Sequence, residues 1–158
     1  MTAEPTQLYV VAVAAVVFRD GRLLAMRRSP LRDAGPGLWE TLSGRLQLGE
    51  SPRDAVLREI AEESGIEVAL RSRPVTAYQA RRAGEPMVVI VFAADHVAGE
   101  VTLSEEHDAF AWLTVDEFAN VSPLAPLVEA ARAAADVIAN ETPLETPLDP
   151  PGAPRSPH

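Results

Sequence analysis

Three glutamates close together in the chain have the side-chain type and spacing needed to bind one divalent cation. Glu59, Glu62 and Glu63 stand at positions i, i+3 and i+4, which share one face of an α-helix with neighbouring Cβ atoms about 5–6 Å apart. Like charges at this spacing destabilise a helix by roughly 0.2–0.5 kcal/mol per pair. A bound cation removes that penalty, and hard carboxylate oxygens suit Mg²⁺. The alternative is an acidic helix face that is simply solvated.

The helix that must position these glutamates is expected at Ser51–Ser64. Ser51 is a suitable N-cap, Pro52 occupies the first helical position, and Asp54 lies three residues after the cap. Gly65 follows as the expected C′ residue, since a left-handed glycine ends many helices. The carboxylates therefore lie in the second half of the helix, where the helix dipole disfavours anions.

Fixed residues on both sides of the three glutamates complete a longer pattern. It consists of a glycine, five residues, a glutamate, seven residues, Arg-Glu, an aliphatic residue, any residue, Glu-Glu, any residue, a glycine and an aliphatic residue. Its fixed positions are filled by Gly44, Glu50, Arg58, Glu59, Ile60, Glu62, Glu63, Gly65 and Ile66. Segment 44–66 thus resembles the Nudix box, a match expected by chance on the order of 10⁻⁹ per starting point.

The resemblance to the Nudix hydrolase family (MutT-like) implies a fold and a reaction. The fold is an α/β/α sandwich with a central mixed β-sheet in a single domain. The reaction is Mg²⁺-dependent hydrolysis of a pyrophosphate bond in a nucleoside diphosphate linked to another group, such as a nucleoside triphosphate. Water attacks phosphorus, and Mn²⁺ is a candidate substitute for Mg²⁺. Clustered carboxylates serve this chemistry through the cation, without a covalent nucleophile.

The same resemblance implies roles for individual residues. Metal binding falls on the main-chain carbonyl of the first glycine and on the three helix glutamates: Gly44, Glu59, Glu62 and Glu63. Glu59 is either a ligand or the base that activates the attacking water, and Glu62 is also counted as catalytic. Arg58 is expected to pair with Glu50 and so hold the loop to the helix, and Gly65 serves the turn that follows.

Further candidates lie outside the box. The segment around Glu106 resembles a loop that supplies an additional metal ligand or general base in many Nudix enzymes. Glu106 is chosen over Glu105 because it precedes His107, which is expected to be a hydrogen-bonding loop residue. The alternative is an ordinary acidic loop. Arg27 and Arg28 follow an expected strand and are candidates for holding a phosphate, or else belong to a solvated strand end.

Strands and two main helices are expected to surround these residues. The strands are expected at Leu8–Phe18, Leu23–Met26, Leu38–Leu42, Val68–Ala80, Pro86–His96, Val101–Leu103 and Ala109–Leu113. A hairpin turn is expected at Asp20-Gly21, a short helix at Val115–Phe118 and a long one at Pro123–Ala139. The mixture indicates one α/β or α+β domain over residues 8–140, between a flexible N-terminus (1–7) and a proline-rich disordered tail (141–158).

Composition excludes several classes of protein and partner. The net charge of −9 argues against binding to nucleic-acid polymers or to membrane surfaces, which are themselves anionic. The chain contains no cysteine, which excludes disulfides, thiolate metal sites and a cysteine nucleophile. No apolar stretch is long enough to span a bilayer, and a cytoplasmic location is expected. The expected partner is a nucleotide substrate, with a homodimer as a candidate assembly.

Two other functions fit the same residues. A non-catalytic Nudix-fold module could sense a nucleotide and regulate a partner, although such modules usually carry a damaged box. The acidic helix could also hold a cation that only stabilises the fold. Substitution of Glu62 by glutamine separates catalysis from sensing, because an enzyme would lose turnover and keep its fold. A purely structural cation predicts a metal-dependent melting shift that added nucleotide leaves unchanged.

Overall fold

The structure of the protein is a computed structural model that describes residues 2–31 and 35–141. Its strands are β1 (Val10–Arg19), β2 (Arg22–Arg28), β3 (Trp39–Glu40), β4 (Leu42–Arg45), β5 (Glu67–Leu70), β6 (Thr76–Arg82), β7 (Glu85–Ala98) and β8 (His107–Leu113). Its helices are α1 (Pro52–Ser64), α2 (Val115–Val121) and α3 (Ala125–Asn140). None of these helices has the length and apolarity to cross a membrane. The expected tail at 141–158 lies outside the described residues from residue 142 onward.

The strands form one mixed sheet around the long strand β1. β1 runs antiparallel to β2 and β4 and parallel to β7. The path β3-β2-β1-β7-β5 is extended by β8, which pairs with β2, and by β6, which pairs with β7. The turn at Asp20-Gly21 joins β1 to β2, and both residues have positive φ, as a tight two-residue hairpin requires. The hairpin expected there is confirmed.

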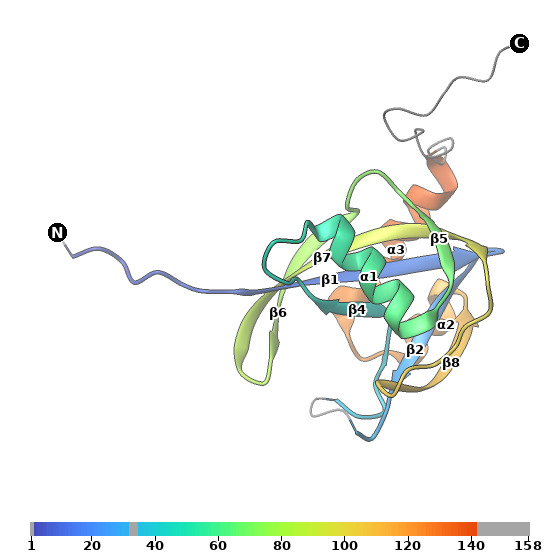
Figure 1. The fold of residues 1–158 in the computed structure, drawn as a ribbon, viewed down its shortest axis with the longest axis horizontal. Helices are drawn as coiled ribbons and strands as arrows, with labels where there is room; N and C mark the ends of the chain where they lie inside the picture. The colour runs from blue at the N-terminus through green and yellow to red at the C-terminus, as the bar shows by residue number, and fades with distance from the viewer. Residues whose placement is uncertain (1, 32–34, 142–158) are drawn as a thin grey trace, which may run out of the picture.

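Helices cover both faces of this sheet (Figure 1). On one face, Val56 and Ile60 of α1 belong to a buried cluster that includes Val13 of β1. On the other face, Phe118 of α2 and Ala131 of α3 belong to a second buried cluster. Successive residues of β1 serve opposite clusters because side chains alternate along a strand. The α/β/α sandwich with a mixed sheet, expected from the resemblance, is therefore confirmed.

Three of the expected strands differ from the structure. The extended piece expected at Leu38–Leu42 is divided at Thr41 between β3 and β4. The expected strand Val68–Ala80 is divided into β5 and β6, and Pro74 in the break has no N–H to donate to a sheet. Residues Val101–Leu103 form no strand. Instead, the N–H of Thr102 bonds the carbonyl of Ser64, which ties this loop to the end of α1.

Candidate active site

Helix α1 begins and ends at the residues that its sequence predicts. The N–H of Asp54 donates a hydrogen bond to Oγ of Ser51 (3.1 Å), and Pro52 is the first helical residue. Gly65 has a φ of 69°, and its N–H bonds the carbonyl of Ala61. These caps fix the helix beside β4 with its three glutamates in its second half.

The three glutamates differ sharply in their exposure to solvent. Glu59 and Glu63 retain 9% and 2% of their accessible surface, whereas the side chain of Glu62 is 59% exposed. The two buried residues stand at i and i+4, on the helix face that meets β4. Burial of two carboxylates is costly unless something neutralises them. An ordinary solvated acidic face therefore does not describe this helix.

At Gly44 of β4 the main chain passes close to the Glu59 carboxylate. A Cβ atom added to Gly44 would overlap all three atoms of that carboxylate. The backbone of Gly44 does not have a positive φ, so the requirement for glycine at this position is one of space. The Glu59 carboxylate thus lies in direct contact with the backbone at Gly44.

Gly44→Ala is expected to displace Glu59 and to weaken cation binding at least tenfold. Overpacking of this kind also destabilises the protein by about 1–3 kcal/mol. Calorimetric titration with Mn²⁺ and urea unfolding measure the two effects. Gly84→Ala is the matched control, since Gly84 has a φ of 81° and no atom near its Cβ position. It is expected to lose stability through backbone strain and to keep its affinity for the cation; equal affinity losses would contradict the steric account.

Arg58 joins the loop before α1 to the acidic face of the helix. Its Nη2 atom lies 2.7 Å from Oε1 of Glu50, and its Nη1 atom lies 2.7 Å from Oε1 of Glu59. Nη1 also lies 3.3 Å from Glu62, and Nη2 donates to the carbonyl of Arg45. The Arg58 guanidinium lowers the pKa of Glu50 through their hydrogen bond. The structure thus brings together Arg58 and Glu50, the pair expected from the sequence.

Glu63 is the most deeply buried of the three glutamates. Its Oε1 atom accepts a hydrogen bond from the N–H of Ser43 (2.9 Å), but its Oε2 atom has no hydrogen-bond partner. Burial raises the pKa of this carboxyl to about 9 despite the Ser43 bond, and the nearby carboxylates of Glu106 and Glu40 add to the effect. Burial also raises the pKa of Glu59, against the effect of Arg58. A proton or a cation must neutralise Glu63 near neutral pH.

The cation-free protein is expected to lose stability as pH rises from about 5 to about 9. The pKa of Glu63 in the folded chain, about 9, lies above the ordinary value of 4.5. The folded chain therefore binds a proton that the unfolded chain releases, and the free energy of unfolding falls by at most about 1.4 kcal/mol per pH unit for one proton. Urea unfolding in EDTA at several pH values measures this slope. A slope that Glu63→Gln leaves unchanged would contradict the assignment.

A buried chain of polar side chains continues from Glu63 into the sheet. Nδ1 of His107 lies 3.3 Å from Oε2 of Glu63, and Nε2 of the same ring lies 2.9 Å from Oε1 of Glu40. Glu40 also pairs with Nη2 of Arg28 (2.7 Å). Although burial acts to raise the pKa of Glu40, the hydrogen bonds from His107 and Arg28 lower it overall. Sequence reasoning missed Glu40, whose signal was a lone charge in the apolar stretch Leu38–Leu42.

The candidates outside the box occupy different environments. Glu106 lies just before β8 and comes within reach of Glu63 and His107, since one ligand atom from each lies within 4.8 Å of the others. Arg27 pairs with Asp108 (2.7 Å) at a half-exposed site. Arg28 is mostly buried in its pair with Glu40. The structure therefore brings Glu106 to the helix glutamates, whereas Arg27 is paired with Asp108 and does not join them.

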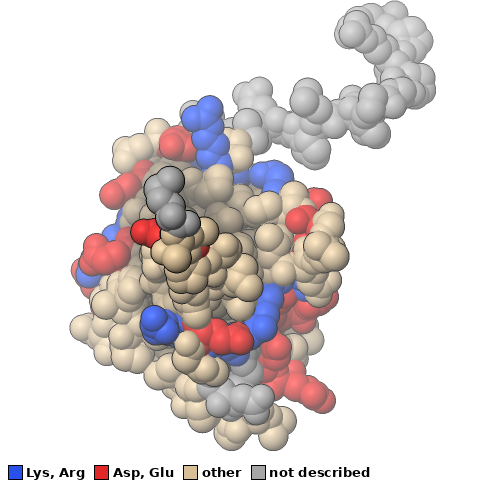
Figure 2. Space-filling view, turned by 90° about the vertical axis from the view of Figure 1, so that its left-hand side faces the viewer, with Lys and Arg blue, Asp and Glu red and all other residues tan. Residues whose placement is uncertain are grey.

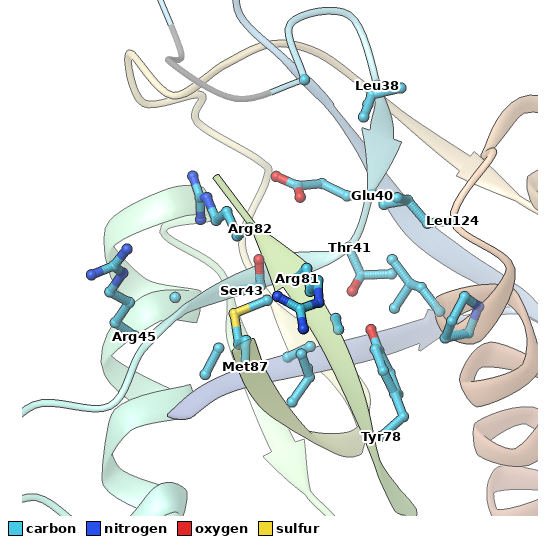
Figure 3. Close-up of a pocket in the computed structure, with 18 of the residues that line it drawn as sticks. Leu38, Glu40, Thr41, Ser43, Arg45, Tyr78, Arg81, Arg82, Met87 and Leu124 are labelled. Atoms are coloured by element: carbon cyan, nitrogen blue, oxygen red, sulfur yellow. The ribbon is translucent and has the colours of Figure 1, made fainter. Parts of the chain in front are cut away.

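Two adjoining cavities open beside these glutamates. The first is an open, polar cleft of about 560 Å³, lined in part by Gly44, Glu59, Arg82 and Glu106. The second is a largely apolar pocket of about 310 Å³ between β6, β7 and the start of α3. Figure 3 shows Tyr78 and Met87 in this pocket, with Arg45 and Arg82 on the side nearer α1. Gly44, Arg45 and Arg82 line both cavities, which therefore adjoin each other.

Figure 2 shows one face of the molecule, on which uncharged atoms make up most of the middle, while arginine and acidic side chains lie towards the edges and in a group below the middle. Burial raises the pKa of Tyr78 to about 12, so its hydroxyl stays protonated and able to donate. The site thus combines buried carboxylates, a polar opening and an apolar recess.

Comparison with known proteins agrees with this geometry. The NUDIX domain model matches residues 8–135. A MutT-like protein of Streptomyces ambofaciens is 41% identical over 116 residues, which cover 73% of this chain and 70% of the relative. The CTP pyrophosphohydrolase of Escherichia coli (strain K12) is 33% identical over 117 residues, which cover 74% of this chain and 84% of that enzyme.

A solved structure extends the likeness to three dimensions. The crystal structure of a MutT NUDIX hydrolase from Burkholderia pseudomallei superposes with a TM-score of 0.64 and 31% identity. The superposition covers 82% of this chain and 98% of the other. The residues matched by the NUDIX domain model, 8–135, include the whole box, α1 and the strands of the sheet. The chain therefore belongs to the NUDIX family and is a hydrolase that acts on the pyrophosphate bonds of nucleotides.

Proposed function

We propose that this protein hydrolyses a nucleoside triphosphate or a related nucleotide by attack of water on phosphorus, with Mg²⁺ as its cation and Mn²⁺ as a substitute. The observation that carries the proposal is the pair of buried carboxylates on α1: Glu59 lines the polar cleft that adjoins the apolar pocket, and Glu63 is buried one helical turn further along. A domain extending over residues 8–140 holds this site, from the strand β1 to the end of α3.

The side chains fit a divalent cation. Oε2 of Glu63 is buried without a hydrogen-bond partner, and a positive charge beside it would relieve the cost of its burial. We assign cation binding to Glu59, Glu62 and Glu63 together with the carbonyl of Gly44. When bound, the cation neutralises phosphate charge and lowers the pKa of the attacking water.

A carboxylate must accept the proton of the attacking water. Glu59 and Glu106 both line the cleft and are candidates for this role. Burial raises the pKa of Glu59, which brings it nearer to the pH at which a general base is most effective. Glu62 completes the catalytic set, and Arg58 holds both Glu59 and Glu62 in place.

The two cavities fit the two ends of a nucleotide. The polar cleft would take the phosphates, with Arg45 and Arg82 at its junction with the pocket as their contacts. Arg28, which also lines the pocket, remains a candidate phosphate contact. The pocket would take the base against Tyr78, and the buried hydroxyl of Thr41, which has no hydrogen-bond partner, would meet a polar group of the substrate. The CTP pyrophosphohydrolase among the relatives supports a triphosphate substrate.

The proposal is tested by incubating the purified chain with a panel of nucleoside triphosphates, dinucleoside polyphosphates and nucleotide sugars. Mg²⁺ and Mn²⁺ are compared, and the products are identified so that the attacked phosphorus is known. Release of phosphate or pyrophosphate is expected, and Glu62→Gln should lose it without unfolding. Nucleotide binding without release would favour a sensing module. A cation-dependent melting shift unaffected by nucleotide would favour a purely structural cation.

A further inference from the structure

A buried ring nitrogen of His107 points at the proposed cation site. The side chain of His107 has no solvent exposure, and its Nδ1 atom has no hydrogen-bond partner. It faces Oε2 of Glu63, which is also buried without such a partner, at 3.3 Å. Two buried polar atoms that face each other without a hydrogen bond are costly unless a proton or a cation lies between them.

The other side of the ring determines which form of the imidazole is present. Nε2 of His107 lies 2.9 Å from Glu40, and Glu40 is held by Arg28 at 2.7 Å. Because an ionised carboxylate can only accept, the proton is assigned to Nε2. The Nδ1 lone pair of the neutral ring is then directed at Glu63. A carboxylate that fixes the second nitrogen in this way is the usual support of a metal-binding histidine.

The spacing of the available ligand atoms fits a single cation. One oxygen of Glu63, one of Glu106 and a ring nitrogen of His107 all lie within 4.8 Å of one another. Around an octahedral ion with ligands at about 2.1 Å, adjacent ligands lie about 3.0 Å apart and opposite ligands about 4.2 Å apart. The 3.3 Å between His107 and Glu63 matches adjacent ligands, and the Glu106 oxygen lies no more than 4.8 Å from either atom, against about 4.2 Å for opposite ligands.

We propose that Nδ1 of His107 is a ligand of a divalent cation held with Glu63 and Glu106, and that this site prefers a first-row transition-metal ion to Mg²⁺. Imidazole binds such ions well, whereas Mg²⁺ prefers oxygen ligands alone. The inference rests on the proposed cation site, shares Glu63 with it, and adds Glu106 and a nitrogen ligand. The preference concerns intrinsic affinity at equal concentrations of the two ions, and Mg²⁺ remains the proposed cation for hydrolysis. The competing arrangement places a shared proton between Glu63 and His107 and keeps nitrogen out of the cation's coordination shell.

Mn²⁺ alone, without nucleotide, is the probe. Electron spin-echo spectroscopy detects nitrogen bound to Mn²⁺, and ¹⁵N-labelled histidine shows that the nitrogen belongs to a histidine. The chain has three histidines: His96, His107 and His158. The nitrogen signal is expected in the wild-type chain and in the double variant His96→Gln/His158→Gln, where His107 alone remains. It should be lost in His107→Gln, whose preference for Mn²⁺ over Mg²⁺ should fall about tenfold by calorimetric titration.

The outcomes separate this inference from the proposed function. Mn²⁺ bound without a histidine nitrogen, no binding of Mn²⁺, or a signal lost in the His96→Gln/His158→Gln variant overturns the inference. The double variant decides the matter even where His107→Gln does not fold. Nucleotide hydrolysis with Mg²⁺ by a chain that shows no nitrogen signal overturns only the inference. A nitrogen signal from a chain that hydrolyses no nucleotide overturns only the proposed function.

Discussion

Replacing Glu63 by glutamine is expected to lower kcat by at least about 10³-fold while the protein remains folded. The change removes one negative charge from the proposed cation site, and such a site contributes several kcal/mol of transition-state stabilisation, where about 4 kcal/mol equals 10³-fold. The introduced amide keeps an oxygen for the Ser43 N–H and gains an N–H that can donate to Nδ1 of His107. The substitution thereby removes the unpartnered Oε2 of Glu63 and gives Nδ1 of His107 a donor.

Stability is therefore expected to move in the opposite direction from activity. The free energy of unfolding of Glu63→Gln in EDTA at pH 8 should equal or exceed that of the native chain, because no buried carboxylate has to be neutralised. Glu129→Gln on α3, on the far face of the sheet, is the control and should change neither kcat nor stability. Initial rates with Mg²⁺ and urea unfolding give both quantities. A variant that unfolds, or that retains more than a tenth of the native kcat, would contradict the role of Glu63.

The local features of the site could be predicted because short stretches of sequence determine them. Helix α1 follows from Ser51, Pro52 and Gly65, which determine its ends through local hydrogen bonds and φ angles. The pairing of Arg58 with Glu50 follows from a fixed spacing within the box. The hairpin at Asp20-Gly21 likewise depends on the two residues in the turn.

The features that escaped prediction depend on contacts between distant parts of the chain. Glu40 and His107 are 67 residues apart, and only the pairing of β2 with β3 and with β8 brings them together. Single-sequence reasoning therefore placed His107 in a loop, whereas it is the buried first residue of β8. The apolar pocket likewise needs residues of β6, β7 and the start of α3, which carry no recognisable motif, beside β1 and β4. The sequence also could not show which carboxylates are buried, because the position of a residue on a helix face does not reveal what that face packs against.

Glu40→Ala is expected to destabilise the protein by about 3–5 kcal/mol, the largest effect on stability among the substitutions considered. Glu40 is 2% exposed and binds both Arg28 and His107, so its removal leaves a buried guanidinium and a buried imidazole without this carboxylate. Asp108→Ala provides a matched control, because Asp108 pairs with Arg27, the residue before Arg28 on β2. Arg27 pairs with Asp108 at a similar distance, 2.7 Å, but in a half-exposed position, so Asp108→Ala should cost only about 0–1 kcal/mol.

Urea unfolding at pH 7 in EDTA compares the two variants without any contribution from bound cations. Equal losses in Glu40→Ala and Asp108→Ala would show that burial does not strengthen the Arg28–Glu40 pair. Glu40→Gln distinguishes the charge from the shape, because the amide oxygen can still accept from one partner while the negative charge is lost; an intermediate cost of about 1–3 kcal/mol is expected. Since Glu40 also fixes the ring of His107, both Glu40 variants should weaken Mn²⁺ binding, whereas Asp108→Ala should leave it unchanged.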